Sequence, residues 1–194
     1  TIAVPQFISL LLMSQMLAEN GVFNNLLKSW GWISESIPFL TNSTVAKVTI
    51  IVVNVWVGIP YTMLICTGIL MNIPEDLYES ARIDGAGPVK AFYKITLPYM
   101  LHVTGPYLLT QFIGNLNNFN IIYLLSGGGP STLEFAINGA GETDLLITWL
   151  YKLIMDKQWY GVASVISILM FIITAVVSLI VYNRSGAVKN EEDF

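Results

Sequence analysis

Two sets of polar residues interrupt long apolar segments of the chain at the spacing of a helix face. They are Asn54, Gly58 and Tyr61 in one segment, and Gln111, Asn115 and Asn118 in another. Each set follows the pattern i, i+4, i+7, which places its members on one side of a helix. Val57 lies on the same side as the first set. The sequence therefore predicts two helix faces carrying amides, a phenol and a glycine.

These residue types suit an uncharged, hydroxyl-rich ligand. An amide both donates and accepts hydrogen bonds, as a sugar hydroxyl does. Tyr61 offers a ring for the apolar face of a pyranose, and Gly58 would let a ligand approach the backbone. The surrounding segments contain no Asp, Glu, Lys or Arg to hold an ion. The alternative is that the amides only join helices, and we prefer that interpretation for Asn117 and Asn120.

The composition places these faces in a membrane protein. Only 11% of the 194 residues are charged, against about 25% in soluble domains. No charged residue occurs at positions 48–73, 95–133 or 158–183, and each run exceeds the ~20 residues that cross a hydrocarbon core. The net charge of -4 argues against nucleic-acid binding. Cys66 is the only cysteine, so a disulfide-stapled secreted domain is excluded.

We expect an all-α polytopic membrane protein, because helices satisfy their own backbone in lipid and the runs lack β-barrel alternation. About four spans are predicted, and residues 1–194 form a single transmembrane domain. The predicted spans are residues 2–18, 48–71, 95–122 and 159–182. Since the first span is already apolar at Thr1, we expect the chain to be the C-terminal part of a longer protein.

Three connections join the predicted spans. Residues 19–47 are expected to contain a short surface helix, and residues 72–94 hold most of the charge. Residues 123–157 are expected to form an external loop with an amphipathic helix near its end. An even number of spans puts residues 72–94 on the side opposite the other two connections. The distribution of Lys and Arg favours a cytoplasmic 72–94 only slightly.

The charged connection carries strong helix signals. Pro74 is a good first helical residue, and Glu75 and Asp76 place negative charge at the helix N-terminus. Gly85 can end that helix in the left-handed conformation, and Pro88 can start a second one. We expect a short helix, a tight turn and a helix that returns to the membrane.

Two motifs stand out in this connection. Residues 78–86 read Tyr-Glu-Ser-Ala-Arg-Ile-Asp-Gly-Ala, and residues 95–98 read Ile-Thr-Leu-Pro. These motifs resemble the EAA loop of the permease subunits of ABC importers. The resemblance implies that residues 73–98 are cytoplasmic and insert a coupling helix into a cleft of an ATPase subunit. The implied coupling residues are Glu79, Ser80, Ala81, Asp84, Gly85 and Ala86. Ser80 stands where the family usually has Ala.

Further segments resemble the larger permease subunit of maltose importers, and the resemblance covers nearly the whole chain. They are residues 54–61, 115–120, 127–130 and 140–146. In that subunit, sugar is held in mid-membrane by residues matching Asn54, Val57, Gly58, Tyr61, Asn115 and Asn118. Gln111 falls where that subunit has a Ser, and we expect it to alter the pocket.

The resemblance implies a type I ABC importer for maltose or maltodextrin in the cytoplasmic membrane of a prokaryote. The implied partners are a second permease subunit, two ATPase subunits and an extracytoplasmic sugar-binding protein. ATP and Mg would be used by the ATPase subunits, because this chain has no phosphate-binding loop. We expect this chain to bind no cofactor, no metal and no nucleic acid.

Three alternatives stay open. In the first alternative, the chain belongs to the same class of importer but its cargo is another sugar, a sugar alcohol or glycerol phosphate. An intramembrane enzyme would need ionisable groups within the spans, and His102 is the only candidate. A scaffold subunit without transport would show no loss of uptake when Glu79 is changed.

Overall fold

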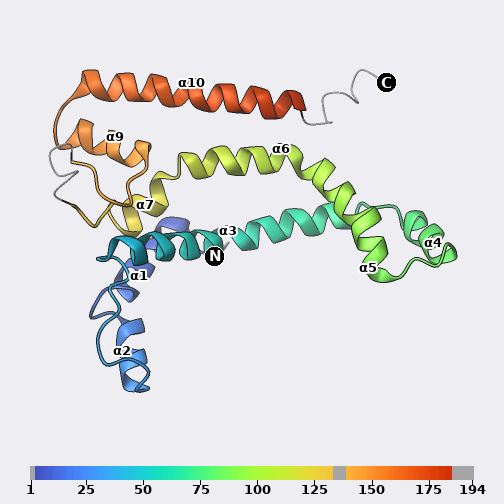
Figure 1. Ribbon diagram of the computed structural model, residues 1–194, viewed down its shortest axis with the longest axis horizontal. Helices are drawn as coiled ribbons and strands as arrows, with labels where there is room; N and C mark the ends of the chain where they lie inside the picture. Colours follow the sequence, from blue (N-terminus) through green and yellow to red (C-terminus); the bar gives the residue numbers. More distant parts are fainter. Residues whose placement is uncertain (1–2, 133–138, 185–194) are drawn as a thin grey trace. The chain divides into compact units, whose positions relative to one another are not determined.

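The computed structural model describes residues 3–132 and 139–184, and the described residues are helical with turns and no strands. The chain divides into two compact units. The first unit comprises residues 1–60 and 115–172, and the second comprises residues 61–114 and 173–194. The elements are α1 (Gln6–Met16), α2 (Val22–Ser29), α3 (Ser43–Leu70), α4 (Glu75–Ile83), α5 (Pro88–Ala91), the π-helix η1 (Phe92–Thr96), α6 (Leu97–Leu116), α7 (Phe119–Leu125), α9 (Leu146–Met155) and α10 (Tyr160–Arg184). Figure 1 labels the α-helices.

Among the described residues, two helices are long and apolar enough to cross a membrane, by length and composition. They are α3 over Ser43–Leu70 and α10 over Tyr160–Asn183. They correspond to the predicted spans 48–71 and 159–182. The all-α prediction is thereby confirmed for the described residues.

The other two predicted spans differ from the expectation. The predicted span 2–18 contains α1, which has 11 residues and a length of roughly 16 Å at 1.5 Å per residue. That length is about half of the hydrocarbon core. The predicted span 95–122 is interrupted, because α6 ends at Leu116 and α7 begins at Phe119. The side chain of Asn118 caps the new helix and accepts from the backbone N–H of Ile121 at 3.3 Å.

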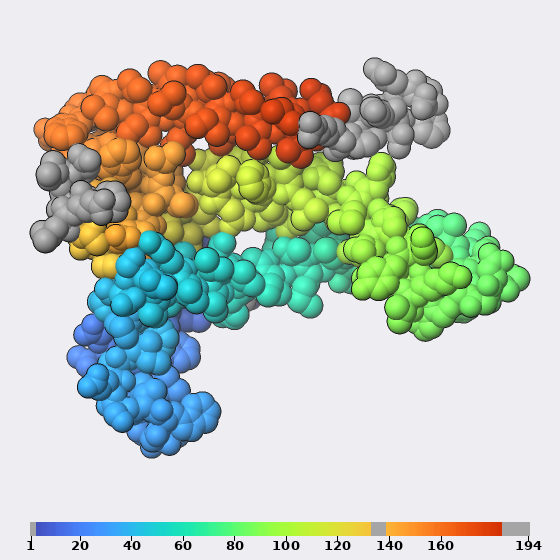
Figure 2. Space-filling model, in the orientation of Figure 1, coloured from blue at the N-terminus to red at the C-terminus, as the bar shows by residue number. Residues whose placement is uncertain are grey.

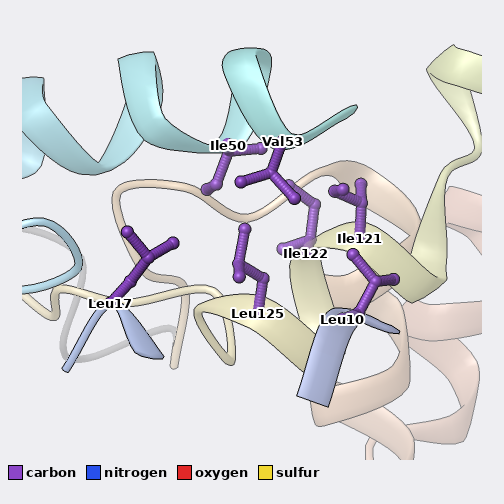
Figure 3. Packing of buried hydrophobic residues seen from close by; sticks show 7 residues of the cluster. All are labelled: Leu10, Leu17, Ile50, Val53, Ile121, Ile122 and Leu125. Carbon is purple, nitrogen blue, oxygen red and sulfur yellow. The ribbon is translucent and has the colours of Figure 1, made fainter. Parts of the chain in front are cut away.

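The core of the first unit forms where α1, α3 and α7 meet. Its buried members are Leu10, Leu17, Ile50, Val53, Ile121, Ile122 and Leu125, drawn in Figure 3. A polar contact supports this packing, since the Ser14 hydroxyl donates to the Leu125 carbonyl at 2.9 Å. The short helix α1 is therefore a packing element of this core.

A buried asparagine holds the connection between α1 and α3. Asn24 of α2 is fully buried. Its amide donates to the carbonyls of Ala18 and Ile37 at 3.3 and 3.0 Å, and its oxygen accepts from the Ile37 N–H at 2.8 Å. The polar side chain is thus satisfied by backbone groups. The predicted surface helix in residues 19–47 is confirmed as α2.

The loop after α7 folds around a buried ion pair. Lys152 of α9 lies 2.7 Å from the Asp144 carboxylate, whose side chain is only 3% exposed. The same carboxylate oxygen accepts from the Gly141 N–H at 2.7 Å. A side chain at Gly128 would overlap both members of the pair, and Gly128 has a φ of +82°. The predicted amphipathic helix in residues 123–157 is present as α9, and residues 133–138 lie outside the described residues.

The second unit contains the charged connection and the helices beside it. The helix α4 has no buried residue. The segments α5, η1 and α6 follow one another directly from Pro88. In the space-filling view, the residues of α4 and α5 are drawn in green (Figure 2). Pro74 is the N-cap of α4, so its prediction as the first helical residue was off by one position. The proline fits there because an N-cap needs no helical hydrogen bond from its own N–H.

Candidate functional site

Three asparagines of the first unit form a chain of hydrogen bonds. The Asn118 amide donates to the Asn54 oxygen at 3.0 Å, and the Asn54 amide donates to the Asn115 oxygen at 2.7 Å. Asn54 lies on α3, Asn115 lies near the end of α6, and Asn118 caps α7. The structure thus brings together three residues that the helix-face pattern selected from two distant segments.

The asparagine chain is accessible to a ligand. Asn115 is exposed, and Asn54 and Asn118 are half-buried. No charged residue occurs between positions 48 and 73 or between 95 and 133. The chain therefore offers amide donors and acceptors without a formal charge nearby in the sequence, which fits polar neutral ligands.

Two other predicted residues on α3 have different surroundings. Val57 packs against the hydrophobic core of the first unit, so its side chain has a structural role. Gly58 is exposed, and a side chain added there would meet no atom within 4 Å. The expected approach of a ligand to the backbone at Gly58 stays a prediction.

Tyr61 and Gln111 belong to the second unit and are described with it. The ring of Tyr61 lies 6.2 Å from the ring of Tyr107. The Tyr107 hydroxyl is also 2.9 Å from the Thr62 hydroxyl. Gln111 is half-buried on α6. Tyr107 was not among the predicted residues, although it precedes Gln111 by four positions and so continues the helix face of Gln111 and Asn115.

The predicted coupling residues lie on and just after α4. The exposed ones are Glu79, Ser80, Asp84 and Gly85, whereas Ala81 and Ala86 are half-buried. The charged side chains of α4 form no ion pair with other described residues. Its polar surface is therefore available to a partner.

The end of α4 has the geometry that its sequence predicts. Gly85 has a φ of +71°, and its N–H donates to the Arg82 carbonyl at 3.0 Å. The Ala86 N–H donates to the Ala81 carbonyl at 2.8 Å. These two bonds define a Schellman motif, which satisfies the last carbonyls of the helix. The prediction that Gly85 ends the helix is confirmed.

A second set of charges lies at the start of α3. Glu142 forms an ion pair with Lys47 at 2.9 Å and accepts from the Ser43 hydroxyl at 3.0 Å. The hydrogen bond from Lys47, followed by that from Ser43, holds the pKa of Glu142 below its usual value. This pair joins the loop after α7 to α3, and no spacing pattern in the sequence indicates it.

The described residues are helical, and two of their helices are long and apolar enough to cross a membrane. Together with an uncharged amide cluster and an exposed charged helix, these features are typical of a membrane transport subunit. Residues 1–187 match the family described as "Binding-protein-dependent transport system inner membrane component". The chain belongs to this family. The resemblance to permeases of sugar ABC importers is thereby confirmed.

Curated relatives in the family are permease subunits with sugar cargoes. The maltodextrin transport system permease protein MdxF of Bacillus subtilis is 39% identical over 98% of this chain and 45% of its own length. The galactooligosaccharides transport system permease protein GanP of the same species is 36% identical over 97% and 44%. The maltose/maltodextrin transport system permease protein MalF of Escherichia coli is 36% identical over 92% and 35%. The chain spans less than half of the length of these relatives.

A solved structure supports the same fold. The crystal structure of a bacterial alginate ABC transporter, in complex with an alginate pentasaccharide-bound periplasmic protein, contains a chain that is 26% identical. The match covers 94% of this chain and 61% of that one, with a TM-score of 0.79. The fold is therefore that of an ABC transporter membrane subunit.

Proposed function

We propose that the chain is the membrane permease subunit of an ATP-driven importer of maltose or maltodextrin in a prokaryotic cytoplasmic membrane. The observation that carries this proposal is the chain of hydrogen bonds joining Asn118, Asn54 and Asn115. The amides provide donors and acceptors for sugar hydroxyls, and the adjoining segments supply no charge to bind an ion. The relatives MdxF and MalF carry maltodextrin in their names, which agrees with this cargo.

The proposed substrate contacts extend beyond the asparagine chain. They are Asn54, Val57, Gly58, Tyr61, Gln111, Asn115 and Asn118. The core packing of Val57 makes it the contact of least importance in this set. Tyr61 and Gln111 are included on the resemblance to the maltose permease.

The second part of the proposal concerns the coupling of transport to ATP hydrolysis. The helix α4 docks on a cytoplasmic ATPase subunit, with Glu79 as its charged contact and Gly85 as the turn that ends it. ATP and Mg are bound by two such subunits, while a second permease subunit completes the pore and an extracytoplasmic binding protein delivers the sugar. The exposed, unburied surface of α4 supports this docking role.

The experiment uses the full-length subunit reconstituted with its partner permease, ATPase subunits and binding protein. ATP hydrolysis and uptake are measured with maltose, maltotriose, a galactooligosaccharide, sorbitol and glycerol phosphate. Stimulation by maltose and maltotriose alone is the expected result. Stimulation by none of these solutes would contradict the proposal.

The second candidate cargo is a galactooligosaccharide, favoured by the likeness to GanP. Both sugars present neutral hydroxyls, so the asparagine chain suits either. Stimulation by the galactooligosaccharide and not by maltotriose would select this candidate and leave the proposed coupling role of α4 intact.

A further inference from the structure

A hydrogen bond joins the proposed docking helix to the helix that returns toward the membrane. The hydroxyls of Tyr78 on α4 and Thr96 in η1 lie 2.8 Å apart, although the two residues are 18 positions apart in the sequence. The Thr96 side chain is buried, in a unit whose neighbouring residues are mostly exposed. A partly buried hydrogen bond of this kind favours one relative position of the two segments.

The contact is the principal side-chain link of α4 to its surroundings. No residue of α4 is buried. Among the described residues, Tyr78 is the α4 side chain that forms a hydrogen bond with another segment. A groove of about 390 Å³, lined by Tyr78, Arg82, Pro88 and Phe92 among others, separates the helix from α5 and η1. The contacts of α4 with its surroundings therefore include the Tyr78–Thr96 bond and the turn at residues 84–87, and they bury no side chain of α4 completely.

The partner residue lies at a special point of the backbone. Thr96 is the last residue of η1 and directly precedes α6. Pro98 has no N–H and its ring would crowd the carbonyl of Lys94 in a regular helix, so the wider π turn fits here. A π turn inside a helix is a frequent site of functional adjustment. Thr96 therefore lies where the helix deviates from regular α-helical geometry.

We propose that Tyr78 is a positioning residue that transmits the movement of the docked α4 to α6 through Thr96. This inference rests on the proposed docking of α4 on an ATPase subunit. The turn at residues 84–87 joins the helices only at their ends. The side-chain bond joins the middle of α4 to the residue that directly precedes α6, and it converts displacement of α4 into displacement of α6. Tyr78 belongs to neither the proposed sugar contacts nor the proposed ATPase contacts.

The test compares Tyr78→Phe, Thr96→Val and the double variant in the full reconstituted complex. Each variant removes a hydroxyl and keeps the shape of the side chain. The control is Tyr93→Phe, because Tyr93 is exposed and its hydroxyl forms no hydrogen bond with described residues. Sugar taken up per ATP hydrolysed, the KM for sugar and co-purification of the ATPase subunits are measured.

Each single variant is expected to lower the sugar taken up per ATP by about threefold to tenfold, the factor that corresponds to one net hydrogen bond. The double variant should be no worse than either single one, and KM and co-purification should match the wild type. An unchanged ratio, additive losses or loss of the ATPase subunits would overturn the inference. The Tyr93→Phe control should behave as wild type.

Hydrogen exchange of residues 92–96 separates this inference from the proposed function. Exchange should be faster in Tyr78→Phe than in wild type, whether or not the complex takes up sugar, because Thr96 has lost its partner. If the wild-type complex takes up none of the tested sugars, the proposed function fails by itself. Unchanged exchange in Tyr78→Phe would then also refute the link to Thr96.

Discussion

The buried ion pair between Asp144 and Lys152 offers the sharpest test of the loop structure. In Lys152→Met, a side chain of similar length replaces the lysine and removes its charge. The Asp144 carboxylate is 3% exposed and then keeps only the hydrogen bond from the Gly141 N–H. Its second oxygen has no hydrogen-bond partner among the described residues. The variant therefore leaves the buried Asp144 carboxylate without the positive charge of Lys152 beside it.

The size of the effect follows from this burial. Removing one partner of a buried pair costs about 3 to 5 kcal/mol. Lys152 is 20% exposed, so water can approach the vacated side and we take the lower end, about 3 kcal/mol. In Asp144→Asn with Lys152→Met, the buried group is neutral and can still accept from Gly141. We expect a loss of about 1 kcal/mol for the double variant, the scale of one net hydrogen bond.

The assay is thermal unfolding of the purified subunit in detergent. For a chain of this size, 1 kcal/mol shifts Tm by about 2 to 4 °C, so Lys152→Met should lower Tm by roughly 6 to 12 °C. Lys157→Met is the matched control, because Lys157 is exposed and forms no ion pair with described residues. A drop equal to that of the control, or a double variant as unstable as Lys152→Met, would refute the reasoning.

Three further predictions concern other contacts. Asn118→Asp keeps the oxygen that caps α7 but cannot donate to Asn54, so sugar uptake should fall at least about tenfold while the subunit still folds. Uptake at the wild-type rate would show that Asn118 only caps α7. The pKa of Glu142 is lowered in the folded state. Its contribution to stability is therefore present above its unfolded pKa and is lost as pH falls through the folded pKa. Glu142→Gln should flatten the change in Tm between pH 7 and pH 4, and an unaltered pH dependence of Tm would contradict this. Gly85→Ala forces a φ of +71° on a residue with a side chain, which costs about 1 kcal/mol and should speed hydrogen exchange in α4. The control Gly87→Ala, at a φ of -71°, should leave that exchange unchanged. Equal exchange rates in the two variants would show that the backbone at Gly85 is not strained by a side chain.

The sequence predicted those elements whose signals are local. The ends of α4 are marked by acidic residues at its start and by Gly85 at its end, and the structure follows both within one residue. The helix-face spacing selected Asn54, Asn115 and Asn118, which lie together. A period of 3.6 residues is sufficient for this, because each helix presents its polar side chains on one face.

The break in the predicted span 95–122 has a local sequence signal that a hydropathy pattern does not detect. Residues 95–133 are uncharged throughout, so their hydropathy indicates one long helix. The break at residues 117–118 instead depends on the preference of Asn for N-cap positions. The same run contains Asn117 and Asn118 in succession, and this pair was the available sign of a helix end.

Two other contacts between distant segments had no sign in the sequence. Nothing in the order of residues pairs Tyr78 with Thr96, or Glu142 with Lys47. Each of these side chains is common at the surface of a membrane protein, and only the folded backbone determines which partner it meets. The sequence therefore indicates which residues are polar, and tertiary packing decides which of them are joined.

The uncharged asparagine chain has a consequence for the response of transport to membrane voltage. A full electronic charge moving across a membrane at 100 mV changes its energy by about 2.3 kcal/mol. Amide groups carry no net charge, and neither does the proposed sugar, so the membrane field does no net work when this ligand moves past Asn54, Asn115 and Asn118. Occupancy of the site should then be the same in polarised and depolarised vesicles. Accumulation of the sugar would depend on the chemical energy delivered through α4 and not on the electrical gradient.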